Sequence, residues 1–155
     1  MKPLYIFDLD GTLADISHRR HFVENRANRW DEFYAACVDD VPNQPVLNIL
    51  RVLASAQCEI WIWSGRSDIV HEQTNAWLQR EDVLPPGHYE PVWSHLTMRT
   101  HGNYTPDDVL KRRWYDRMSD VDKTRLVATF DDRDRVVKMW RDAGVSCFQV
   151  APGDF

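Results

Sequence analysis

The sequence has few cysteines, no long apolar run and no excess of positive charge. Its three cysteines, Cys37, Cys58 and Cys147, are odd in number and lack metal-binding spacing, which is typical of reduced thiols in a cytosol. No stretch of about 18 apolar residues is present, so we expect no membrane span. The net charge of −5 argues against strong non-specific binding of nucleic acid by the whole surface, although it allows a local basic groove.

The chain of 155 residues has a size that suits one domain with a buried core. The first expected strand begins at Leu4, which leaves no room for a secretory signal peptide, so we expect a cytoplasmic protein. No kinase phosphate-binding loop of the form G-x-x-x-x-G-K-[ST] occurs in the sequence. We therefore expect a single domain over residues 1–155 and no kinase domain.

Strand-like and helix-like segments alternate along the chain, which is typical of an α/β fold with a parallel sheet covered by helices. Apolar runs predict five strands, at residues 4–7, 59–63, 96–98, 126–130 and 146–150. Periodicity and cap residues predict helices at residues 45–57, 67–80, 105–118 and 133–143, with Ser67 and Thr105 as N-caps and a loop at Pro85–Gly87. The polar, arginine-rich segment 15–42 predicts two short helices, near residues 16–25 and 30–38.

Polar residues follow three of the expected strands. Asp8 and Asp10 end the first strand, Ser64–Arg66 ends the second, and Asp131 and Asp132 end the fourth. Because ligands bind outside the carboxyl ends of strands in open α/β sheets, we expect these groups to converge. A plain strand ending in an Asx-type turn is the structural alternative for the first pair alone.

The segment Phe7–Leu13, with the sequence FDLDGTL, resembles the first motif of the haloacid-dehalogenase-like phosphatases. Ser64, Lys111 and Asp131–Asp132 fall, in the right order, where that family keeps its other motifs. Further segments resemble the phosphatase half of the phage polynucleotide kinase–phosphatases, namely Ser64–Arg66, Asp107–Lys111, Asp131–Arg133, Met139–Arg141 and Gly144–Phe155. The resemblance implies a three-layer, Rossmann-like fold with a central parallel sheet, a core at residues 1–14 and 43–155, and a small helical cap at about residues 15–42. It also suggests a phage or bacterial gene.

By this resemblance, the chain is expected to be a magnesium-dependent phosphatase that works through an aspartyl-phosphate. Asp8 is then the nucleophile, and Asp10 is the general acid and base. The like charges of the two carboxylates should raise the pKa of one of them, as the acid role requires. The resemblance places Mg²⁺ on the Asp8 side chain, the Asp10 backbone carbonyl and Asp131, with Asp132 as a ligand through water or a support behind the ligands.

The resemblance also assigns contacts with the substrate. The residues concerned are Ser64 and Lys111 on phosphate oxygens, Thr12 on Asp10 or the same oxygens, Arg19 and Arg66 on the substrate, and Asp107 as a residue that holds an arginine. Structural alternatives stay open for four residues: Ser64 in a turn, Lys111 on a solvated helix face, Asp132 as a helix cap and Asp107 as a first-turn acid.

The segment 15–42 is too short for a complete roof over the site, which leaves room for an extended substrate. Its Trp30, Phe33 and Tyr34 either stack on a base or pack the cap on the core. The first hypothesis is removal of 3′-phosphates from polynucleotide ends, with a separate kinase or ligase acting in the same pathway. The second is a phosphatase for free nucleotides. The third is a non-catalytic phosphate-binding module, which the complete catalytic set disfavours.

Overall fold

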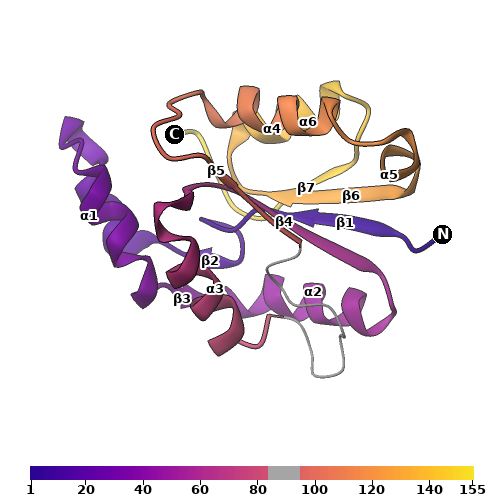
Figure 1. The fold of residues 1–155 in the computed structure, drawn as a ribbon, viewed down its shortest axis with the longest axis horizontal. Coiled ribbons are helices and arrows are strands. Elements are labelled where there is room, and N and C mark those ends of the chain that lie inside the picture. Colours follow the sequence, from indigo (N-terminus) through magenta and orange to yellow (C-terminus); the bar gives the residue numbers. More distant parts are fainter. Residues whose placement is uncertain (84–94) are drawn as a thin grey trace.

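A computed structural model of the protein describes residues 1–83 and 95–155. Five parallel strands form the central sheet, in the order β5-β4-β1-β6-β7 (Figure 1). They are β1 (Leu4–Phe7), β4 (Glu59–Ser67), β5 (Leu96–Arg99), β6 (Leu126–Asp131) and β7 (Cys147–Gln149). All five predicted strands are thus confirmed, as is the α/β class. The loop expected at Pro85–Gly87 lies outside the described residues.

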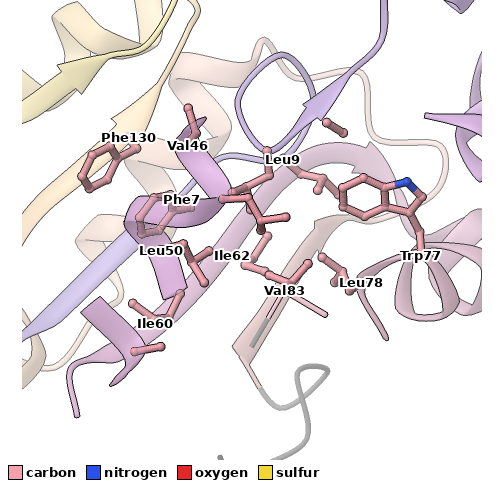
Figure 2. Close-up of a cluster of buried hydrophobic side chains, with 14 residues drawn as sticks. Phe7, Leu9, Val46, Leu50, Ile60, Ile62, Trp77, Leu78, Val83 and Phe130 are labelled. Atoms are coloured by element: carbon pink, nitrogen blue, oxygen red, sulfur yellow. The ribbon is translucent and has the colours of Figure 1, made fainter. Parts of the chain in front are cut away.

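Helices cover both faces of this sheet (Figure 1). The helices α2 (Gln44–Ser55) and α3 (His71–Arg80) lie on one face, whereas α4 (Asp107–Asp116) and α6 (Asp134–Asp142) lie on the other. Successive residues of β1 point to opposite faces, so Phe7 joins the apolar cluster under α2 and Ile6 joins the cluster under α6. Figure 2 shows the first cluster, in which Val46 and Leu50 of α2 lie around Phe7.

The chain leaves the sheet after β1 and returns at α2. The elements of this excursion are β2 (Ala14–Asp15), the 3₁₀ helices η1 (Ser17–Phe22) and η2 (Glu24–Arg26), α1 (Trp30–Ala35), the 3₁₀ helix η3 (Ala36–Asp39) and β3 (Val41–Pro42). β2 and β3 pair antiparallel and close its base. Both short helices expected in residues 15–42 are present, each divided into two pieces. Figure 1 places α1 beyond the edge of the sheet at which β1 ends.

Several local expectations need correction. Helix α4 begins at Asp107 after Pro106, with no side-chain cap, because the Thr105 backbone is held instead by Arg99 and Asn103. Ser67 caps the short 3₁₀ helix η4 (Asp68–Val70), which precedes α3. Helix α5 (Asp120–Arg125) was not predicted. Its six residues are too few for a periodic pattern, although Ser119 caps it with a hydrogen bond of 3.0 Å.

Among residues 1–83 and 95–155, no helix has the length and apolar content needed to cross a membrane.

Candidate active site

The ends of β1, β4 and β6 meet at one edge of the sheet, as expected. They form the floor of a cavity of about 430 Å³. Seven of the predicted site residues line this cavity, namely Asp8, Asp10, Arg66, Asp107, Lys111, Asp131 and Asp132. Further lining comes from the segment between β2 and β3 and from the loop between β5 and α4. The fold therefore gathers most of the predicted site residues around one space.

Lys111 lies between two carboxylates on the cavity floor. Its Nζ donates to Asp8 Oδ1 and to Asp131 Oδ2, each at 2.6 Å. The side chain is buried on the face of α4 that meets the sheet, so the alternative of a solvated lysine is wrong. Burial opposes its charge, but the two carboxylates prevail and raise the pKa of Lys111. The lysine is therefore held as an ammonium directly beside the expected nucleophile.

Asp8, Asp131 and Asp132 form a cluster that could hold a cation. One carboxylate oxygen from each lies within 4.8 Å of the others, and all three residues are buried. Burial raises the pKa of Asp8 well above its ordinary value and, with the charge of Asp131, raises the pKa of Asp132 to about 6. Three buried carboxylates share one lysine, so a hard divalent cation with oxygen ligands fits the remaining negative charge. Asp132 makes no side-chain cap on α6, whose N-cap is Arg133.

Asp10 faces two arginines rather than the carboxylate of Asp8. Its Oδ1 accepts from Arg19 Nη2 at 2.8 Å and also from the Arg66 guanidinium. Burial alone would raise the pKa of Asp10, but Arg66 and Arg19 together lower it. The expectation that the acid residue has the raised pKa is therefore wrong for this arrangement. The raised pKa belongs to Asp8, where burial prevails, whereas two positive charges lower the pKa of Asp10.

A fourth charged residue, Asp40, completes this group and was not predicted. Its carboxylate is fully buried and accepts two bonds of 2.7 Å from Arg19 and one of 2.9 Å from Arg66. His18 Nε2 lies 2.9 Å from the same carboxylate. Two arginines and two aspartates thus form a charge-balanced network between the segment 15–42 and the end of β4. The only sequence signal was an acidic pair, Asp39-Asp40, at the end of an arginine-rich segment.

Asp107 holds two arginines, so it does more than begin α4. Its carboxylate accepts from Arg99 and, at 2.7 Å, from Arg133 Nη1. Gly65 lies against it so closely that any Cβ at this position would collide with the Asp107 carboxylate. Because both arginines hold this carboxylate in place, the last part of β4 favours a glycine at position 65, and Asp107 links this part of β4 to the loop after β6.

Ser64 and Thr12 are less accessible than expected. Both side chains are fully buried, and neither lines the cavity. Ser64 lies within β4 rather than in a turn, and its Oγ accepts from the Arg66 backbone N–H at 3.1 Å, while its O–H remains able to donate. Thr12 Oγ1 has no hydrogen-bond partner among the described residues. Arg19 is likewise buried, with its guanidinium over the Phe33 ring, and it does not line the cavity, although its partners Asp10 and Phe33 do.

The comparisons with known proteins agree with this geometry. The family described as "Polynucleotide kinase PNKP phosphatase domain" matches residues 2–155. The chain belongs to this family. By family and fold it is a haloacid-dehalogenase-type phosphatase domain.

Two relatives of this phosphatase domain are much longer than the chain. A protein of Autographa californica nuclear polyhedrosis virus, "Putative bifunctional polynucleotide kinase/RNA ligase", is 28% identical over 137 residues, which are 87% of this chain and 17% of the viral protein. A chain of the solved "Pnkp1/Rnl/Hen1 RNA repair complex" is 27% identical, with a TM-score of 0.76, covering 99% of this chain and 44% of that one. The class C acid phosphatase of Bacillus anthracis shares the fold, with a TM-score of 0.66 at 17% identity, over 99% of this chain and 67% of that one.

Proposed function

We propose that this phosphatase domain is a magnesium-dependent phosphomonoesterase that removes 3′-phosphates from polynucleotide ends through an aspartyl-phosphate. The observation that carries the proposal is the position of Asp8. It lies on the floor of the cavity, next to Lys111 and to two further buried carboxylates, in a chain of the polynucleotide kinase phosphatase family. Residues 15–42 act as the cap over this floor.

In the first half of the reaction, a carboxylate oxygen of Asp8 attacks phosphorus, and the bond from phosphorus to the sugar oxygen breaks. Asp10 gives its proton to that oxygen. In the second half, water attacks the aspartyl-phosphate while Asp10 takes a proton from it, which frees inorganic phosphate and restores both carboxyl groups. The ionised Asp10 of this structure is suited to the second half. A phosphate that engages Arg66 draws a positive charge away from Asp10 and so favours the proton that the first half requires.

The other polar groups bind the phosphate and offset its charge. Lys111 donates to phosphate oxygens, the buried Ser64 holds the Arg66 backbone through its Oγ, and Thr12 supports the loop that carries Asp10. Magnesium, held by Asp8, Asp131, Asp132 and the Asp10 carbonyl, supplies positive charge that reduces the repulsion between phosphate and nucleophile.

A polynucleotide is favoured as substrate by the charge on the cavity rim. Arg20, Arg133 and Arg135 all line the cavity. Arg135 is exposed and makes no ion pair with any residue in the described ranges, so it is available to a substrate phosphate. Basic side chains beside the phosphate site suit the backbone of a strand. The names of the two longer relatives support a pathway in which a kinase or a ligase acts on the same ends.

Free nucleotides are the second candidate substrate, because a cavity of about 430 Å³ lies in the usual range for small-molecule sites. A matched panel separates the two. Phosphate release is measured with magnesium on 3′-phosphorylated and 5′-phosphorylated oligonucleotides and on free 3′- and 5′-mononucleotides. We expect the 3′-phosphorylated oligonucleotide to have the highest kcat/KM, and Asp8→Asn to release nothing. A higher kcat/KM for free mononucleotides would make the protein a nucleotidase, and full activity of Asp8→Asn would overturn the mechanism.

A further inference from the structure

Tyr104 is an exposed aromatic residue at the mouth of the cavity. It lies in the loop between β5 and α4, its side chain lines the cavity, and the residue is 88% exposed. An aromatic ring contributes most to stability when it is buried, so this position has no evident role in holding the fold. None of the motifs that define the catalytic floor includes it.

The loop that carries Tyr104 is firmly held. Arg99 donates to the carbonyl oxygens of Asn103 and Thr105, at 3.0 and 2.5 Å, and to Gly65 O at 2.7 Å. The Asn103 side chain accepts from Thr105 N at 3.0 Å, so both neighbours of Tyr104 are fixed. A rigid backbone therefore presents a solvent-exposed ring, which reduces the entropy lost when the ring is covered by a ligand.

A second aromatic wall of the same cavity comes from the cap. Trp30 is 45% exposed and lines the cavity together with Phe33 and Tyr34. Phe33 is nevertheless buried, with the Arg19 guanidinium over its ring, whereas Trp30 keeps part of its indole surface accessible. The cavity thus combines a charged floor with aromatic side chains on two separate elements.

We propose that Tyr104 stacks on the base of the nucleotide whose phosphate lies on the cavity floor, with Trp30 forming the second wall of this base subsite. The inference rests on the proposed function and adds the part of the substrate that is recognised besides phosphate. Stacking on an aromatic face accepts all bases, so the subsite selects nucleotide ends over simple phosphate esters without selecting a sequence.

The test compares two 3′-phosphorylated oligonucleotides that differ only in the last residue, which is either an ordinary nucleotide or an abasic sugar that carries the phosphate. Wild type, Tyr104→Ala and Tyr104→Phe are assayed, with Val52→Ala as a control for truncation of an exposed side chain on α2, which does not line the cavity. For the ordinary end we expect Tyr104→Ala to raise KM by about tenfold with kcat unchanged, since one stacked base is lost. Tyr104→Phe and Val52→Ala should keep the wild-type KM.

The abasic end decides between stacking and a general effect on the site. If Tyr104 stacks on the base, Tyr104→Ala leaves KM for the abasic oligonucleotide unchanged. An equal rise in KM for both oligonucleotides, or no rise for the ordinary one, would overturn the base subsite while leaving the 3′-phosphatase activity established. If the wild type releases no phosphate from either oligonucleotide, the proposed function fails and the subsite fails with it.

Discussion

Replacement of Asp40 by asparagine perturbs the charge network beneath Asp10 with little change in volume. The Asp40 carboxylate is fully buried and accepts bonds of 2.7 to 2.9 Å from Arg19 and Arg66. Removing one partner of a buried ion pair costs about 3–5 kcal/mol, because the remaining charge is left without compensation. The asparagine carbonyl keeps one acceptor, so we expect a loss of about 3 kcal/mol from a total stability of about 5–15 kcal/mol.

This loss should lower the melting temperature by about 6–12 °C, given about 2–4 °C per kcal/mol for a domain of this size. The phosphatase rate should fall as well, since Arg19 and Arg66 would no longer be aligned on Asp10. Urea unfolding followed by tryptophan fluorescence measures the loss of unfolding free energy, and thermal unfolding gives the melting temperature. Phosphate release from the 3′-phosphorylated oligonucleotide measures the rate.

Asp116→Asn is the matched control for this substitution. Asp116 pairs with Arg112 at 2.9 Å, but both side chains are about half exposed, so its loss should cost less than about 1 kcal/mol. If Asp40→Asn shows the same urea midpoint and the same rate as Asp116→Asn, the network contributes nothing and the reasoning is refuted.

Three further substitutions test other parts of the site and fold. Lys111→Met removes the cation between two buried carboxylates, so it should lower the melting temperature more in EDTA than in magnesium; equal losses would contradict a shared role for lysine and metal. In Gly153→Ala the added Cβ would overlap the backbone of Asp132 and displace this expected metal ligand. A titration of phosphatase activity with magnesium should therefore show weaker metal binding, and an unchanged titration would contradict the role of Asp132 at the metal. The hydrogen bond from Arg125 lowers the pKa of Glu59 below its ordinary value of 4.5. The pair therefore stabilises the folded state above pH 4.5, and this stabilisation is lost as the pH falls through the lowered pKa. The stability deficit of Glu59→Gln at pH 7, measured by urea unfolding, should therefore shrink in acid, whereas a constant deficit would show that the pair carries no charge-dependent stability.

The sheet was predictable because its strands carry strong local signals. The apolar run of β1 is flanked by parallel partners on both sides, and its residues are buried on both faces, so little polar sequence interrupts it. The convergence of Asp8, Asp131 and Asp132 followed from topology alone, since parallel strands end at one edge of the sheet. Both conclusions needed only the order of elements, which a sequence carries.

The partners of Asp10 were not predictable by the same means. Asp40 is 21 residues from Arg19 and 26 from Arg66, and no periodic pattern links positions on a cap to a strand end at such separations. The pKa of Asp10 depends on which charges lie within a few ångströms, so proximity to Asp8 in sequence gave the wrong sign. Thr105 failed as a cap for a local reason, because Arg99 and Asn103 bind its backbone and Pro106 takes the N-cap position.

The two charge clusters of the floor differ in a way that bears on the proposed mechanism. When fully ionised, the cluster of Asp8, Asp131, Asp132 and Lys111 has three carboxylates against one ammonium, whereas the arginine network is balanced. A dianionic phosphate is repelled by the first cluster, and the proposed magnesium ion would offset this repulsion. In the second cluster, a proton on Asp10 leaves excess positive charge next to the phosphate. Phosphate binding and protonation of Asp10 therefore favour each other, and in the proposed mechanism this allows a carboxylate held ionised by two arginines to act as the acid of the first step.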